Sequence, residues 1–91
     1  MKLNPNCIRA ILLTVEEKCS FDYPWEYVKD EFDSKYLAGF SHDEIIYHIR
    51  QCSLSSLISG VHYYDSGDSI LISDLTPSGH EFLANTRNET I

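Results

Sequence analysis

The fold is decided by the stretch Leu75-Thr76-Pro77-Ser78-Gly79-His80-Glu81-Phe82-Leu83, which follows a predicted β-hairpin. Thr76 is a favourable N-cap and Pro77 suits the first position of a helix, so a helix is expected over residues 76–88. Gly79 shares one face of this helix with three larger side chains, Phe82, Leu83 and Thr86. A glycine on that face would let a neighbouring element approach the helix closely.

Two short runs before this helix are expected to pair as the strands of a hairpin. Val61-His62-Tyr63-Tyr64 and Ser69-Ile70-Leu71-Ile72 flank the four residues Asp65-Ser66-Gly67-Asp68. In that turn Gly67 can supply a positive φ, so an antiparallel hairpin is predicted over 61–73. Because side chains alternate along a strand, one of Tyr63 and Tyr64 is expected in the core and the other in solvent.

The N-terminal segment predicts a helix over 5–18. Asn4 can cap it, and Pro5 stands at its first position. Apolar residues then recur at helical spacing and form one stripe: Ile8, Ile11, Leu12, Val15 and Cys19.

A second helix is predicted over 41–54, because Ser41-His42-Asp43-Glu44 is a capping box. Ile45, Ile49 and Cys52 share its apolar face, with Ile46 at the border. The opposite face carries Asp43, Tyr47, Arg50, Gln51 and Leu54.

Residues 20–40 give a weaker pattern, in which Pro24 interrupts the chain and Gly39 closes the segment. A loop with a short strand or a helical turn near Tyr27–Phe32 is expected there. The order helix, helix, hairpin, helix predicts an α+β fold, and specifically a winged helix of three helices plus a β-hairpin wing. The 91 residues are expected to form this as a single domain spanning 1–91.

The composition limits the partners. The net charge is −7, and seven of the 14 acidic residues fall between residues 22 and 44. Phosphate binding draws its affinity from Lys and Arg, so this balance counts against strong non-specific DNA binding. The chain has three cysteines without paired spacing, no secretion signal and no apolar run long enough to cross a bilayer, which predicts a cytoplasmic protein without a membrane partner.

The sequence carries no pattern that predicts catalysis. Cysteine and histidine spacings do not match a zinc site, and Cys7, Cys19 and Cys52 fall at or near core-facing positions. No nucleophile elbow or phosphate-binding glycine loop is present. We therefore expect no enzyme activity, no metal, no cofactor and no small-molecule substrate. His48 and His80 are interpreted as partly buried histidines bonded to backbone or to a carboxylate.

Several motifs recur in an order and spacing that resemble one known group. They are Met1-Lys2-Leu3-Asn4-Pro5 with Ile8-Arg9 and Ile11-Leu12-Leu13, Tyr47-His48-Ile49, Leu57-Ile58, Leu75-Thr76 and Gly79-His80-Glu81-Phe82-Leu83. Together they resemble the YjcQ-like small proteins of phages and prophages of bacteria, which are regarded as winged helices. The resemblance covers nearly the whole chain and implies a fold and an origin, but no mechanism.

The chain also departs from that group. Relatives tend to have Leu-x-x-Ala-Gly-Leu-Ile after the second helix, whereas here Cys52 replaces the leucine and Ser55-Ser56 replaces Ala-Gly. This departure concerns the end of the second helix and the turn that follows it. Members of the group run on beyond the equivalent of residues 85–90, so the resemblance implies that this chain is truncated at its C-terminus.

Two functions follow from these expectations. Winged helices most often bind DNA, so the first is a DNA-binding or transcription-regulatory module, with Tyr47, Arg50 and Gln51 reading bases from the second helix. The alternative is an acidic protein–protein interaction module that docks a host or phage protein or forms a homodimer. Its patch would comprise Tyr47, Leu54 and some of Trp25, Tyr23 and Tyr27. The alternative explains the negative charge better.

Overall fold

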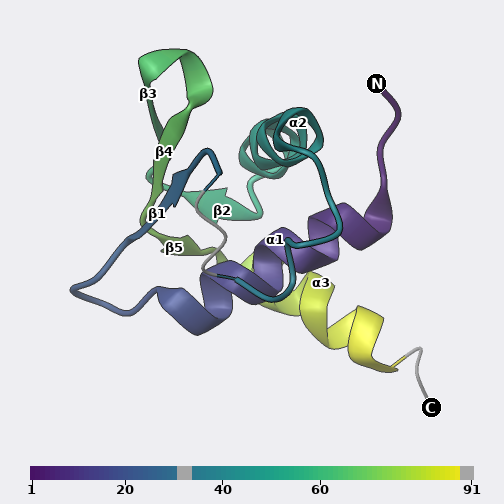
Figure 1. The fold of residues 1–91 in the computed structure, drawn as a ribbon. Helices are drawn as coiled ribbons and strands as arrows, with labels where there is room; N and C mark the ends of the chain where they lie inside the picture. The colour runs from purple at the N-terminus through teal and green to yellow at the C-terminus, as the bar shows by residue number, and fades with distance from the viewer. Residues whose placement is uncertain (31–33, 89–91) are drawn as a thin grey trace.

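Three helices lie to one side of a bent β-hairpin and one additional strand (Figure 1). The computed structural model describes residues 1–30 and 34–88. The helices are α1 (Pro5–Lys18), α2 (His42–Leu54) and α3 (Pro77–Asn88). The strands are β1 (Trp25–Val28), β2 (Ile58–Ser59), β3 (His62–Tyr64), β4 (Ser69–Ile72) and β5 (Asp74–Leu75). The α+β class and the three predicted helices are thus confirmed. No helix within the described residues is both long and apolar enough to span a membrane.

Each helix begins where its capping residue predicts. The Asn4 side chain accepts a hydrogen bond from the Asn6 N–H at 3.0 Å, ahead of α1. The capping box of α2 is complete, because the Ser41 hydroxyl accepts from the Glu44 N–H at 3.2 Å and the Glu44 carboxylate accepts from the Ser41 N–H at 3.1 Å. At α3 the Thr76 hydroxyl accepts from the Gly79 N–H at 3.0 Å. Capping hydrogen bonds between neighbouring residues therefore mark where all three helices begin.

The predicted hairpin is confirmed and extends further than expected. β3 pairs with β4, and after a bend β2 pairs with β5. The bend lies at Gly60, which has φ 65° and lies so close to Ser73 that a Cβ would collide with its side chain. The part of the hairpin beyond the bend, residues 62–72, is called the distal hairpin below, and Figure 1 shows it projecting beside α2.

β1 completes a three-stranded antiparallel sheet in the order β1-β4-β3. Trp25 pairs with Ile72 and Val28 with Ser69. The strand expected near Tyr27–Phe32 therefore starts two residues earlier, and Phe32 lies outside the described residues. The position of β1 is determined by pairing with β4, which lies more than 40 positions further along the chain. No local turn signal indicates where this strand begins.

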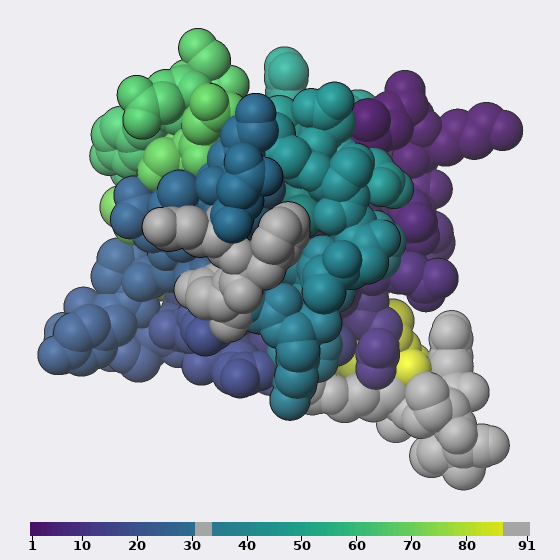
Figure 2. Space-filling view, viewed as in Figure 1, coloured from purple at the N-terminus to yellow at the C-terminus, as the bar shows by residue number. Residues whose placement is uncertain are grey.

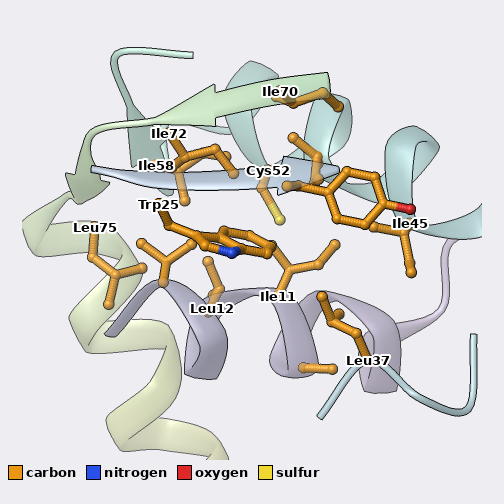
Figure 3. Close-up of a cluster of buried hydrophobic side chains, with 14 of the residues drawn as sticks. Ile11, Leu12, Trp25, Leu37, Ile45, Cys52, Ile58, Ile70, Ile72 and Leu75 are labelled. Carbon is orange, nitrogen blue, oxygen red and sulfur yellow. The ribbon is translucent and has the colours of Figure 1, made fainter. Parts of the chain in front are cut away.

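The core lies between α1, α2 and the inner side of the sheet (Figure 3). Trp25 packs above Ile11 and Leu12 of α1, and the Cys52 thiol points into the same cluster. Cys7 and Cys52 are buried, as their core-facing positions predicted, and Cys19 is half-buried. The apolar face predicted for α2 is confirmed as well, because Ile45 and Ile49 are fully buried.

α3 docks on the hairpin through the face that contains Gly79. A Cβ on Gly79 would collide with the Leu57 carbonyl oxygen and approach the Leu75 side chain to 3.0 Å. Leu83 is fully buried and Phe82 partly buried on the same face. The predicted close approach at this glycine is therefore confirmed.

Some exposures differ from the predictions. Tyr63 and Tyr64 are 49% and 51% exposed, so neither is a core residue, because β3 is an edge strand that projects beyond the core. Trp25 and Tyr27 are buried on the inner side of β1 and cannot belong to an exposed patch, whereas Tyr23 is exposed. His80 is exposed too, with Nδ1 3.9 Å from a carboxylate oxygen of Glu16.

Candidate functional site

A groove of about 510 Å³ runs along the outer face of α2. The distal hairpin lies on one side of it and the N-terminal residue on the other; Figure 2 shows the hairpin (green), α2 (teal) and the N-terminal segment (purple) in this order. We call it the α2 groove. Its lining residues are Met1, Asp43, Ile46, Tyr47, Arg50, Tyr63, Ser66 and Gly67. The volume is in the range of protein ligand sites, which is about 300–1,000 Å³.

Four lining residues come from α2 at helical spacing. Asp43, Ile46, Tyr47 and Arg50 are separated by three, one and three positions, so they lie along one side of the helix. Ile46 and Tyr47 are half-buried and make the apolar floor. Asp43 and Arg50 are exposed and stand two turns apart, about 10 Å along the helix axis. The groove therefore has an apolar middle with opposite charges toward its two ends.

Tyr47 is held in place by its neighbour His48. The two rings meet edge to face with centroids 5.1 Å apart. His48 is 1% exposed, and its Nε2 lies 2.8 Å from the Asn4 backbone nitrogen while Nδ1 lies 2.7 Å from the Glu44 carbonyl oxygen. Because the Asn4 N–H can only donate, Nε2 must accept, and Nδ1 carries the proton that it donates to Glu44. The expected buried, backbone-bonded role of His48 is confirmed, and this histidine joins the N-terminal segment to α2.

Tyr63 contributes the wall on the side of the hairpin. It pairs with Ile70, so its side chain lies on the core-facing side of the sheet at the edge strand. Burial raises the pKa of its phenol, and the positive charge of Arg50 acts in the opposite direction. The Arg50 guanidinium and the Tyr63 hydroxyl thus form a polar end of the groove that can donate hydrogen bonds.

Polar contacts hold the tip of the distal hairpin against α2. The Tyr27 hydroxyl lies 2.7 Å from His42 Nδ1, and His42 Nε2 lies 3.3 Å from a carboxylate oxygen of Asp68. The Tyr27 and His42 rings also stack with centroids 5.7 Å apart. The Asp68 carbonyl accepts from the Lys29 N–H at 2.8 Å, which ties the same turn to the segment after β1. These contacts, made by residues outside the groove lining, hold the hairpin tip beside α2.

The donor and acceptor roles in these contacts depend on the two partners of His42. In the neutral tautomer that carries its proton on Nε2, His42 would face the Asp68 carboxylate with an N–H and would accept from the Tyr27 hydroxyl at Nδ1. Burial, with smaller contributions from the negative charges of Asp30 and Asp68, raises the pKa of Tyr27 to about 12, so the phenol keeps the proton that it donates. Sequence reasoning missed His42 because its two partners lie 15 and 26 positions away, with no spacing signal.

The structure brings together only part of the predicted site. Tyr47 and Arg50 line the α2 groove, whereas Gln51, which is half-buried, and Leu54, which is 70% exposed, lie outside it. Tyr63, Ser66 and Gly67 join the site from the hairpin, although no motif in the sequence connects them with α2.

The charges around the groove are mostly negative. Arg50 is the cationic side chain of the lining and Asp43 the acidic one, while the hairpin tip adds exposed Asp65 and Asp68. Across residues 1–30 and 34–88, no group of three or more His, Cys, Asp or Glu side chains could hold a metal ion. The groove can therefore offer apolar contact, a cation and hydroxyl donors to a ligand.

Comparison with known proteins places the chain in a family. Residues 2–91 match the model of a family described as "Hypothetical protein (DUF2513)". An "Uncharacterized protein" of Haemophilus influenzae is 32% identical over 92 residues, which cover all of this chain and 72% of that relative. No solved structure matches the chain. The resemblance to the YjcQ-like group is not touched by these matches and stays a prediction. Because the family model covers almost every residue and a relative aligns over the full chain, this protein belongs to the DUF2513 family.

Proposed function

We propose that this protein is a winged-helix interaction domain that binds a segment of another protein in the α2 groove. The observation that carries the proposal is the groove itself: an apolar floor, a cation and hydroxyl donors at one end, on the face that a winged helix uses for recognition. The proposal includes the absence of enzyme activity, a cytoplasmic location and the phage or prophage origin that the YjcQ-like resemblance implies.

The topology supports the winged-helix assignment. A first helix, a strand, a second helix and a hairpin follow one another, and the first strand pairs with the returning strand of the hairpin in the order β1-β4-β3. In a winged helix, α2 would be the recognition helix and the distal hairpin would be the wing. The residues between β1 and α2, where a helix often stands in such folds, include a turn in which the Phe40 N–H donates to the Leu37 carbonyl at 3.1 Å.

The lining residues indicate the chemistry of the partner. Ile46 and Tyr47 suit an apolar or aromatic side chain, since aromatic anchors in apolar pockets dominate many interfaces. Arg50 and the Tyr63 hydroxyl suit a carboxylate beside that anchor. Asp43, two turns away, would repel a second acid and so fixes the direction of the bound segment. We therefore expect an aromatic residue followed by an acidic one.

DNA remains the second candidate, favoured by the topology and by the exposed face of Arg50. In that case Arg50 would pair with guanine and Gln51 with adenine. The charge opposes it, because the chain carries −7 overall and Asp65 and Asp68 lie at the tip that would meet phosphates. A protein segment fits the same face without this repulsion.

Binding of short peptides tests the proposal. Three peptides of equal length carry Phe-Asp, Phe-Lys or Ala-Asp at their centre, and their affinities are measured by fluorescence anisotropy. We expect Phe-Asp to bind most tightly and both changes to weaken binding by about tenfold, because each removes one of the two matched contacts. Arg50→Ala should remove the preference for Asp over Lys. Equal binding of all three peptides, or none, would contradict the proposal.

A further inference from the structure

We propose that this chain carries one such segment itself, and that the Phe21–Asp22 turn of one copy enters the α2 groove of a second copy. The inference rests on the proposed function of the groove. It assigns a partner, a second molecule of the same chain, and a head-to-tail mode of association.

The turn between α1 and β1 presents its aromatic residue rigidly. Ser20 and Tyr23 form an isolated antiparallel bridge. The Ser20 N–H donates to the Tyr23 carbonyl oxygen at 2.9 Å, and the Tyr23 N–H donates to the Ser20 carbonyl oxygen at 3.2 Å. Phe21 and Asp22 stand between them, and Phe21 is 100% exposed. The preceding Cys19 is anchored, because its thiol donates to the Ile72 carbonyl at 3.5 Å. Because two backbone hydrogen bonds already hold this turn, burial of Phe21 by a partner orders mainly its own side chain.

The turn and the groove match in chemistry. Phe21 offers the aromatic anchor for the floor made by Ile46 and Tyr47, and the adjacent Asp22 offers a carboxylate for Arg50. The two residues are adjacent, as the apolar floor and Arg50 are in the groove. Fully exposed phenylalanine is costly in water, and burial in the groove removes that apolar surface from solvent.

The turn cannot reach the groove of its own chain. Figure 1 shows the segment between α1 and β1 projecting from one side of the molecule, whereas α2 and the distal hairpin face another direction. Figure 2 shows the same separation on the molecular surface. The two surfaces lie apart on one molecule, so the contact must be made between copies. Such an interface is heterologous: each copy can give its turn to one neighbour and its groove to another.

The strength of this contact follows from size and charge. One side chain and its neighbours in a groove bury less than the roughly 1,200 Å² of a stable interface, so the association is expected to be weak and concentration-dependent. Two copies of net charge −7 also repel each other. Salt screens this repulsion, with a Debye length of about 8 Å at physiological ionic strength, so association should increase as salt is raised from low concentration.

Sedimentation of two complementary variants tests the inference. Phe21→Ala removes the anchor and keeps the groove, while Arg50→Glu reverses the charge in the groove and keeps the turn. Each variant alone should associate at least about tenfold more weakly than the wild type. An equimolar mixture should form a one-to-one dimer, because the intact turn of one variant meets the intact groove of the other. Tyr64→Ala is the matched control: an exposed tyrosine outside both surfaces, expected to leave association unchanged.

Any of three other results would overturn the inference. A wild-type chain that stays monomeric into the millimolar range, association that survives Phe21→Ala, or a mixture no larger than its separate components would exclude this head-to-tail contact. The proposed function fails separately, through the peptide measurements, because free Phe-Asp peptides report on the groove whether or not the protein associates with itself. Circular dichroism melting of all variants confirms that they are folded.

Discussion

Ser56 ends α2 in a conformation that suits glycine better. Its φ is 58°, in the left-handed region, where an L-residue with a Cβ is disfavoured. The Leu57 N–H donates to the Cys52 carbonyl at 2.9 Å and the Ser56 N–H to the Ser53 carbonyl at 3.1 Å. These two bonds define a Schellman motif, which closes a helix and most often places glycine at this position.

Replacing this serine should stabilise the protein. We expect Ser56→Gly to raise the free energy of unfolding by about 0.5–1 kcal/mol, because glycine adopts positive φ without steric cost. Urea denaturation measures the change. Ser55→Gly is the control: Ser55 has φ −88°, so glycine there should lower stability. A loss of stability in Ser56→Gly would show that the serine side chain itself supports the turn.

Buried thiols should make the protein sensitive to alkaline pH. Burial raises the pKa of both Cys7 and Cys52 to about 12, from an ordinary value of 9.0. Above pH 9 the unfolded chain releases these protons while the folded chain keeps them, so the free energy of unfolding should fall as pH rises from 9 toward 12. Urea denaturation at pH 8 and pH 10 checks this. Cys52→Ala should show a shallower fall, and a pH-independent stability would contradict the predicted shifts.

Elements whose signals are local could be predicted from the sequence. Asn4, Ser41 and Thr76 each mark a helix start through side chain–backbone hydrogen bonds within three residues, so all three starts were found. β1 starts two residues before the strand expected near Tyr27–Phe32, because a strand of four residues depends on its partner β4. The bend at Gly60 was missed for the same reason, since it depends on the distant Ser73.

The capping box gives a direct test at the level of the element. Ser41→Ala should lower the free energy of unfolding by about 0.5–2 kcal/mol, because the Glu44 N–H loses its acceptor. Thermal melting or urea denaturation measures the loss. Ser55→Ala, an exposed serine at the other end of α2, should change stability by less than about 0.5 kcal/mol. Equal effects of the two substitutions would mean that the cap contributes nothing.

At the level of the whole molecule, the groove could be predicted only in part. Its α2 residues share a helix face, so Tyr47 and Arg50 were found from spacing. The other lining residues come from the N-terminus and the distal hairpin, and only the tertiary fold brings them to α2. Helical periodicity predicts Gln51 and Leu54 as site residues too, because it defines one face of α2. It does not show which part of that face lies beside another element.

The net charge predicts weak binding to DNA. With −7 overall and Arg50 as the cation in the groove, few phosphates can be neutralised. We expect a dissociation constant for random duplex DNA at or beyond about 10⁻⁴ M at physiological salt, measured by fluorescence anisotropy. If sequence-specific binding exists, Arg50→Ala should reduce it sharply and leave stability within about 0.5 kcal/mol. Tight binding of random duplexes by residues 1–91 alone would overturn the charge argument.

The central claim is that the α2 groove receives a protein segment. One measurement tests it most directly: an NMR titration of the ¹⁵N-labelled protein with the Phe-Asp peptide, followed by random duplex DNA on a second sample. The account predicts saturable shifts of the amides of Ile46, Tyr47, Arg50 and Tyr63 with the peptide, and little change with the duplex. Saturable shifts of these amides with the duplex, and none with the peptide, would contradict it.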